Sequence, residues 1–248
     1  MKHLFFLIAV ALFFGCSDGE FNSSEVVNGS GTGGSLARFA IAGNMLYIVD
    51  NTTLRTFDVS NAADPKPVGQ TQIGVGIETI FPYQGNLFIG ANDAMYIYDL
   101  QNPANPRQLS RYDHFVGCDP VVAKGNYAFV TLRITGCRPV GQNVLDVIDI
   151  SNRSNPRVVA TFPMDGPYGL GITNNNTLFV CEGLNGMRVF DATEPLALRQ
   201  ISYLTNIKAF DVIALPFSLL VIGQDGLRQY NYADPTQLEL LSFLPVEN

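Results

Sequence analysis

Short apolar runs, separated by polar turns that contain Gly, Pro, Asn or Asp, fill most of the chain. A four-residue apolar segment recurs about every 41 residues, with one longer step of about 50, at positions 46–49, 87–90, 128–131, 178–181 and 220–223. A second marker, which ends the next apolar run, keeps the same period at Asp58, Asp99, Asp149, Asp191 and Asn231. Two markers with one period indicate a structural unit that is repeated five times.

Each unit is predicted to contain four strands. An apolar strand such as residues 77–81 precedes the tetrapeptide, and a short turn such as Asn185-Gly186 follows it, as in a β-hairpin. A third strand leads into the Asp or Asn marker, a Pro-rich corner follows, and a fourth strand such as residues 158–162 ends the unit. Four strands in about 40 residues are typical of a propeller blade. We therefore predict an all-β fold, a five-bladed β-propeller of four-stranded antiparallel blades over residues 35–248. The first and last blades are expected to close the ring without exchanging a strand.

The unit is also similar to a known repeat. Leu46-Tyr47-Ile48-Val49-Asp50, together with the corner pattern Asp-hydrophobic-Ser-Asn-x-x-x-Pro at residues 149–156, resembles the LVIVD repeat family of bacterial β-propeller lipoproteins. The resemblance covers residues 35–248. It implies an exported, lipid-anchored propeller without an established reaction, and it supplies no catalytic residue.

The first segment has the pattern of an export signal. Residues 4–14 are apolar, which is too short for a membrane-spanning helix of about 20 residues. We predict that residues 1–15 are a lipoprotein signal peptide, because Cys16 follows the expected cleavage point in a context that resembles the bacterial lipobox. Cys16 would then carry the lipid, and the Gly-rich residues 16–34 would form a flexible tether. The alternative is an ordinary signal peptide followed by a chance cysteine. The expected location is the bacterial cell envelope, at the outer membrane.

Composition narrows the classes of function. The net charge of −7 argues against nucleic-acid binding and against attraction to anionic lipid head groups. The chain is therefore expected to meet a membrane only through the lipid on Cys16. After the signal, His114 is the single histidine, which excludes a zinc site built from several histidines. Since the sequence contains no P-loop and no GxSxG motif, we interpret His114 as a surface-loop residue.

Two cysteines are predicted to form a disulfide. Cys118 opens the third unit, and Cys137 lies in the insertion that lengthens one step of the repeat. The loop that enters a first strand and the loop between second and third strands lie on the same face of a propeller. Exported proteins meet an oxidising compartment, so a Cys118–Cys137 disulfide is expected to hold this long loop. Cys181 ends a core strand and is expected to be a buried thiol.

One acidic pattern suggests a binding site. Counting back twelve residues from the end of each tetrapeptide gives a carboxylate in three units, at Glu78, Asp119 and Asp211, and Ala37 and Gly169 in the other two. This position begins the innermost strand, so the three carboxylates are expected near the mouth of the central channel. The neighbours expected at the same mouth are Arg38, Tyr168, Arg133 and Arg138.

Three interpretations of these carboxylates stay open. They cap backbone N–H groups, they bind a sugar or a Ca²⁺ ion, or they are the acid and base of a glycoside hydrolase. The favoured prediction is a cell-envelope lipoprotein whose propeller is a ligand-binding or protein-interaction module. Its partner would be an envelope protein or a glycan, with no catalytic residue, no firm metal site and no cofactor. The alternative is a carbohydrate-active hydrolase that uses the channel-mouth carboxylates.

Overall fold

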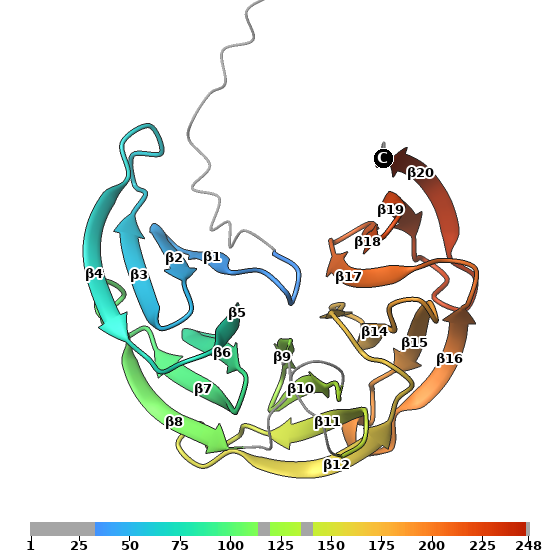
Figure 1. Cartoon of the computed structure of the whole chain (residues 1–248), viewed down its shortest axis with the longest axis horizontal. Helices are drawn as coiled ribbons and strands as arrows, with labels where there is room; N and C mark the ends of the chain where they lie inside the picture. The colour runs from blue at the N-terminus through green and yellow to red at the C-terminus, as the bar shows by residue number, and fades with distance from the viewer. Residues whose placement is uncertain (1–32, 114–119, 135–140, 247–248) are drawn as a thin grey trace, which may run out of the picture.

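The computed structural model describes residues 33–113, 120–134 and 141–246. These residues form five four-stranded antiparallel sheets, each made of four consecutive strands. The sheets are arranged as blades around a central axis, with the first strand of each blade innermost and the fourth outermost (Figure 1). The prediction of an all-β, five-bladed propeller is confirmed, and each blade uses only its own strands.

The strand boundaries follow the repeat. Blade 1 contains β1 (Phe39–Ala42), β2 (Met45–Val49), β3 (Thr53–Asp58) and β4 (Lys66–Gln72). Blade 2 contains β5 (Ile77–Tyr83), β6 (Asn86–Ala91), β7 (Ala94–Asp99) and β8 (Arg107–Asp113). Blade 3 contains β9 (Val121–Lys124), β10 (Tyr127–Leu132), β11 (Val144–Asp149) and β12 (Arg157–Pro163). Blade 4 contains β13 (Leu170–Ile172), β14 (Thr177–Cys181), β15 (Met187–Asp191) and β16 (Arg199–Leu204), with the short 3₁₀ helix η1 (Pro195–Ala197) before its last strand. Blade 5 contains β17 (Ala209–Ala214), β18 (Leu219–Gly223), β19 (Gly226–Asn231) and β20 (Glu239–Pro245).

The repeated Asp or Asn ends the third strand of every blade in the same way. Its side-chain oxygen accepts a hydrogen bond from the backbone N–H two residues later, as in an Asx turn. The five donor–acceptor distances lie between 2.8 and 3.2 Å. The acceptors are Asp58, Asp99, Asp149, Asp191 and Asn231. This local hydrogen bond satisfies a backbone amide where the chain leaves the strand. The corner can therefore be predicted from the sequence.

Apolar cores lie between neighbouring blades. In the described residues four such clusters are present, between blades 1 and 2, 2 and 3, 3 and 4, and 4 and 5. The middle strands β6 and β14 are buried along their whole length, because each of their faces contacts a neighbouring blade. This arrangement accounts for their nearly continuous apolar sequence.

The ring is open between blade 5 and blade 1. No apolar cluster among the described residues joins these two blades, and Figure 1 shows a gap between β17–β20 and β1–β4. Within the described ranges, hydrogen bonds link the two sides near the axis, where Ser35 and Leu36, just before β1, bond to Asp211 of β17. The expectation of a closed ring is therefore wrong. The repeat count was correct, but a count does not fix the angle between successive blades.

Two smaller expectations concern the thiols and the membrane. Cys181 is a free, buried cysteine at the end of β14, as predicted. In the described ranges, no helix has the length and apolar character that crossing a bilayer requires.

Candidate functional site

Cross-strand pairing defines which residues occupy equivalent positions at the inner ends of the blades. In blade 2, Ile80 pairs with Ile89 and Thr79 with Gly90, and the register shifts at Glu78. The same pairing in blade 4 places Leu170 opposite Val180, with Gly169 O accepting from Cys181 N at 2.9 Å. The residue equivalent to Glu78 in blade 4 is therefore Tyr168, one residue before Gly169.

Blade 5 departs from the spacing that the sequence suggested. The segment equivalent to residues 87–90 of blade 2 is 219–222 and not the predicted 220–223, because Leu219 pairs with Tyr230 as Leu87 pairs with Tyr98. The connection between the first two strands has the same length in both blades, since Ala214 pairs with Leu219 and Pro82 with Leu87. Asp211 pairs with Ile222, and the register shifts at Phe210. Phe210 is therefore the residue equivalent to Glu78, and Asp211 corresponds to Thr79. Counting back twelve residues misaligned Gly169 and Asp211 by one position for two different reasons. In blade 4 the connection is one residue longer, since Ile172 pairs with Leu178 where Pro82 pairs with Leu87, and in blade 5 the tetrapeptide was placed one residue too late.

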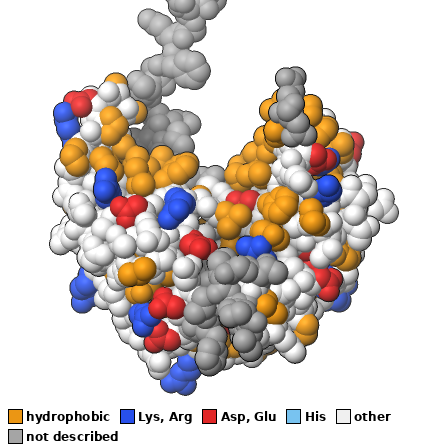
Figure 2. Space-filling view, in the orientation of Figure 1, with side chains coloured by type: hydrophobic (Ala, Val, Ile, Leu, Met, Phe, Trp, Pro, Cys, Tyr) orange, Lys and Arg blue, Asp and Glu red, His pale blue; other side chains and the backbone are white. Residues whose placement is uncertain are grey.

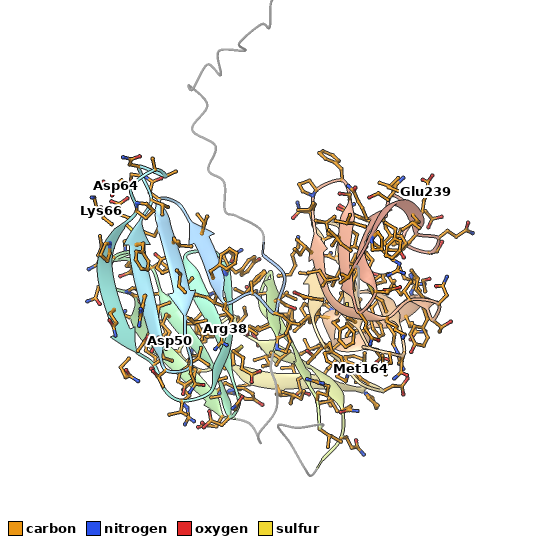
Figure 3. The ribbon with its side chains drawn as sticks, turned by 45° about the horizontal axis from the view of Figure 1, so that its top comes forward. Arg38, Asp50, Asp64, Lys66, Met164 and Glu239 are labelled. Atoms are coloured by element: carbon orange, nitrogen blue, oxygen red, sulfur yellow. The ribbon has the colours of Figure 1, made fainter. Side chains whose placement is uncertain are left out.

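The channel mouth gathers charged and aromatic side chains from four blades. Arg38 Nη2 donates to Ile77 O at 2.7 Å, and Figure 3 shows Arg38 near the middle of the molecule. Burial raises the pKa of Glu78, while the positive charges of Arg38 and Arg133 oppose that rise. The guanidinium carbon of Arg133 lies 3.8 Å from the ring centroid of Tyr168, a cation–π contact. Three of the predicted neighbours thus lie around or near Glu78.

Phe210 completes this group, and the sequence reading did not single it out. Its ring meets that of Tyr168 edge to face, with centroids 4.9 Å apart. The two rings occupy equivalent positions in adjacent blades, so they contact each other for the same topological reason that Glu78 lies near the axis. The signal that could have found Phe210 is the spacing to the repeated marker. Gly90 lies nine residues before Asp99, and the residue nine before Asn231 is Ile222, from which counting back twelve gives Phe210.

Asp211 has a different environment from Glu78. It is buried, its Oδ1 accepts from Ser35 Oγ at 3.1 Å, and its Oδ2 accepts from Leu36 N at 3.3 Å. Burial raises the pKa of Asp211, and these hydrogen bonds partly offset the rise. A Cβ added at Gly34 or at Gly169 would lie 2.1 Å from an Asp211 carboxylate oxygen. Asp211 is therefore enclosed by backbone, and it connects the segment before β1 to blade 5.

Some predicted site residues lie outside the described residues. These are Cys16, Cys118, Asp119, Cys137 and Arg138, together with His114. The lipidation site, the disulfide and the third carboxylate therefore stay predictions. Among the residues that are described, no group of three His, Cys, Asp or Glu side chains is placed to hold a metal ion.

A second surface feature is the open cleft between blades 1 and 5. Its floor is a cavity of about 420 Å³ that contains Asp211 and is otherwise lined by apolar or glycine residues. Phe39 and Ile41 of β1 lie on one side, and Ile213 of β17 and Ile222 of β18 lie on the other. Figure 2 shows hydrophobic side chains on both sides of this V-shaped opening. We call these two surfaces the blade 1 wall and the blade 5 wall.

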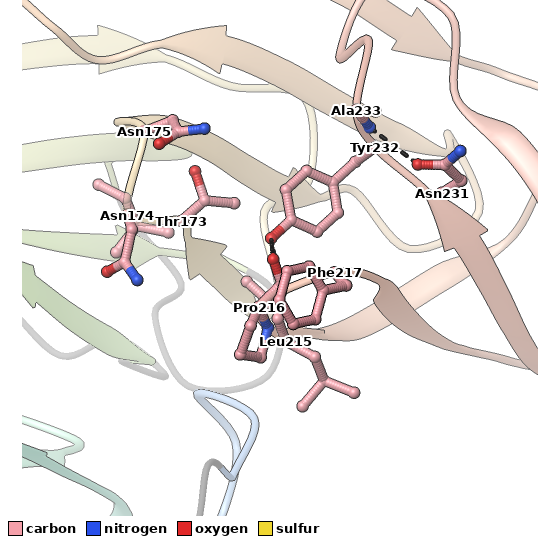
Figure 4. A pocket seen from close by; sticks show the side chains of 11 residues that line it. Thr173, Asn174, Asn175, Leu215, Pro216, Phe217, Asn231, Tyr232 and Ala233 are labelled. Atoms are coloured by element: carbon pink, nitrogen blue, oxygen red, sulfur yellow. Dashed lines mark hydrogen bonds between the residues drawn. The ribbon is translucent and has the colours of Figure 1, made fainter.

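A third feature is a pocket of about 650 Å³ between blades 4 and 5 (Figure 4). It lies beside the β13–β14 and β17–β18 connections and the corner after β19. Tyr232 Oη donates to Leu215 O at 2.6 Å and lies 2.9 Å from Pro216 O, which fixes the loop that carries Phe217. The Phe217 side chain is 90% exposed. No charged side chain lines the pocket.

A buried glutamate at the inner end of blade 4 was also missed. Glu182 is 1% exposed, its Oε1 accepts from Asp165 N at 3.1 Å, and its Oε2 accepts from Tyr203 Oη at 3.1 Å. Arg188 Nε lies 3.2 Å from Glu182 Oε2, and its guanidinium carbon lies 5.1 Å from the Tyr203 ring centroid. These partners account for both carboxylate oxygens, so Glu182 stabilises the fold and is not free to act on a ligand.

The comparison with repeat families agrees with the resemblance seen in the sequence. The LVIVD repeat is matched at residues 33–72 and 118–162. Two segments of the chain therefore match the LVIVD repeat. These matched segments span blade 1 and most of blade 3, and the geometry extends the same four-stranded unit to the other three blades. No curated protein matches the sequence.

The chain spans about two thirds of the length of the solved structures that it matches. The periplasmic gluconolactonase PpgL of Pseudomonas aeruginosa matches with a TM-score of 0.62 and 15% identity, over 82% of this chain and 68% of that one. A Lactobacillus plantarum protein matches with a TM-score of 0.66 and 14% identity, over 82% and 69%. BamB of Moraxella catarrhalis matches with a TM-score of 0.54 and 12% identity, over 85% and 63%. At these identities the likeness shows the propeller fold alone.

Proposed function

We propose that this chain is an exported lipoprotein, anchored through Cys16 to the outer membrane of a bacterial envelope, whose propeller is a protein-interaction module. The observation that carries the interaction role is the open cleft, because its two walls present the kind of apolar surface that is buried between all the other blades. Exposed apolar patches rimmed by polar residues mark interaction sites on soluble domains. The apolar character of the walls favours a protein over a glycan as the partner in the cleft.

Residues at equivalent repeat positions differ in exposure between the end blades and the inner blades. Phe39 in blade 1 is 57% exposed, whereas its counterpart Ile80 in blade 2 is 1% exposed. Ile222 in blade 5 is 41% exposed, whereas its counterpart Cys181 in blade 4 is fully buried. The same repeat position is thus covered inside the array and uncovered at its two ends. A partner in the cleft would bury this surface at roughly 25 cal/mol per Å² of apolar area.

The channel mouth supports a second, smaller binding role. Tyr168 and Phe210 provide an aromatic surface, and Glu78, Arg38 and Arg133 provide polar groups beside it. This combination suits a neutral polar ligand such as a sugar. Two arginines close to Glu78 disfavour a Ca²⁺ ion, because a dication would meet their positive charges. We therefore propose no metal or cofactor.

A hydrolase finds less support than a binding module. A glycosidase needs two carboxyl groups about 5–10 Å apart that face one substrate. Asp211 bonds to Ser35 and Leu36 within the fold, and it does not occupy the position equivalent to Glu78. Catalysis would then depend on Glu78 and Asp119. The gluconolactonase match is at 15% identity, and it adds no substrate to this proposal.

Location and interaction can be tested separately. Fractionation of cells that express the chain should place it in outer-membrane fractions, and a Cys16→Ala variant should leave them. For the interaction, a photoreactive amino acid is introduced at position 39 or 222 in living cells. Val159 on β12 is the matched control, because it is 42% exposed and lies away from the cleft.

The interaction proposal expects crosslinked products from positions 39 and 222 and none above background from position 159. Equal yields at the three positions would remove the cleft as a binding surface. A chain that stays in soluble fractions with Cys16 intact would overturn the lipid anchor but would leave the cleft result standing.

A further inference from the structure

We propose that the open cleft binds a second copy of this chain, with the blade 1 wall of one copy packed against the blade 5 wall of the other. This inference rests on the proposed function, since it names the partner of the same cleft. Two observations support a second copy as the partner: the composition of the two walls and their relation within the repeat.

The first observation is that both walls are apolar over three strands or more. On the blade 5 wall, Ile222 pairs with Leu227, and Leu227 pairs with Leu244, so these three side chains share one face. Leu220 and Ile213 lie on the same face, because Leu220 pairs with Ile213. Leu244 at the outer strand is an exposed apolar residue, as Ile222 is.

The blade 1 wall has the same character. Phe39 pairs with Ile48, and Ile41 pairs with Leu46, which places these four side chains on one face. Phe57 continues that face, because it pairs with Leu46. The opposite face of blade 1 carries Tyr47, Val49 and Leu54, all packed against blade 2. The wall is therefore the blade's second apolar face, and it lacks a blade to cover it.

The second observation is that the two walls are complementary by position. Each of the four closed interfaces joins the later face of one blade to the earlier face of the next. The blade 5 wall is a later face and the blade 1 wall is an earlier face, so they are the two halves of a fifth interface of the same type. They do not meet within one chain (Figure 1). Between two chains they can pack as two sheets face to face, about 10 Å apart.

A second copy of the chain carries both the blade 1 wall and the blade 5 wall, and this distinguishes it from an unrelated partner. When the blade 5 wall of one copy covers the blade 1 wall of another, the remaining two walls are again complementary. A two-fold arrangement can use both contacts at once and leave no apolar wall exposed.

The proposal is tested by measuring the mass of the chain in solution with light scattering and sedimentation velocity. The protein is the full chain with Cys16→Ser, so that neither lipid nor detergent contributes mass. We expect a dimer for this protein and for its Val159→Asp control, and monomers for Phe39→Lys and Ile222→Asp. Circular dichroism and thermal unfolding of each variant check that the blades stay folded.

A mixing experiment tests the pairing of the two walls. Phe39→Lys keeps an intact blade 5 wall, and Ile222→Asp keeps an intact blade 1 wall. An equimolar mixture of the two monomers is therefore expected to regain a dimer that contains one copy of each. A dimer that persists in both single variants, or a mixture that stays monomeric, would overturn the head-to-tail contact.

The outcomes separate this inference from the proposed function. A parent protein that is monomeric at every concentration measured, while positions 39 and 222 still crosslink in cells, rejects the second copy and keeps the interaction module. Crosslinked products of twice the chain mass, from positions 39 and 222 but not 159, support both.

Discussion

Ser35 connects two distant parts of the ring through Asp211. Ser35 Oγ donates to Asp211 Oδ1 at 3.1 Å and accepts from Leu170 N at 2.7 Å. The turn that precedes β1 is thereby attached to the innermost strands of blades 4 and 5. This contact lies at the axis, directly beneath the cleft, so it holds the two ends of an open ring at a fixed separation.

Asp211→Ala should destabilise the fold strongly for a single substitution. It removes an acceptor for Ser35 and for Leu36 N, and leaving buried donors unpaired costs about 1–3 kcal/mol each. Urea unfolding, followed by fluorescence, measures the loss. The control is Asp64→Ala at an exposed corner, where Asp64 pairs only with Lys66 on the surface, and about 0.5 kcal/mol or less is expected. Equal stability of the two variants would show that the tie at the axis is not stabilising.

Acid should destabilise the propeller through its turn aspartates. The pKa of Asp50 is lowered to about 2 by hydrogen bonds from the Thr52 backbone and from Thr53, and the pKa of Asp191 is lowered to about 2 chiefly by Thr193. A lowered pKa contributes stability that is present above the ordinary value of 3.8 and is lost as the pH falls towards 2. The urea midpoint is therefore expected to fall over this range.

Asparagine substitutions show whether protonation of each aspartate lowers or raises the free energy of unfolding. Asp50→Asn keeps an acceptor oxygen but cannot be protonated, so its urea midpoint should fall less between pH 4 and 2. Asp211→Asn should behave differently, because burial raises the pKa of Asp211. Protonation of Asp211 therefore adds to the free energy of unfolding in acid. This contribution is lost as the pH rises through the raised pKa. Identical pH profiles for the two variants would contradict these assignments.

The sequence allowed the blades to be predicted because their rules are local. The Asx turns at Asp58 and Asp149, for example, need only a side chain and an amide two residues away. The site was harder to predict, since it depends on the register at the inner end of each blade. In blade 5 the second strand begins its equivalent segment at Leu219 and not at Leu220, and this one-residue difference gives Phe210, not Asp211, the position equivalent to Glu78.

The open ring was not predictable from the repeat. Blade 1 and blade 5 have the same alternation of apolar residues as the inner blades, so Phe39 and Ile222 look like core residues in the sequence. Their exposure follows from the angle between blades, which many side chains in four separate cores determine together. No single motif encodes that angle.

Cys118 and Cys137 are predicted to be joined by a disulfide. Closing a loop of this length is expected to contribute about 3 kcal/mol in the chain-entropy description. Peptide mapping without reductant should recover one crosslinked peptide pair, and the reduced protein should unfold at a lower urea concentration. Buried Cys181 is an internal control, because its thiol should stay free and become reactive only on unfolding. Free thiols at both positions in protein prepared without reductant would contradict the prediction.

The aromatic pair at the channel mouth should determine whether sugars bind there. Soluble oligosaccharides are expected to raise the melting temperature of the parent protein, since Tyr168 and Phe210 offer ring surface and Glu78 offers an acceptor beside it. Phe210→Ala and Glu78→Gln should each abolish the shift. Phe217→Ala is the matched control, because this exposed ring belongs to the pocket between blades 4 and 5. A shift that is lost only in Phe217→Ala would move the sugar site to that pocket, and a shift unaffected by all three variants would exclude both sites.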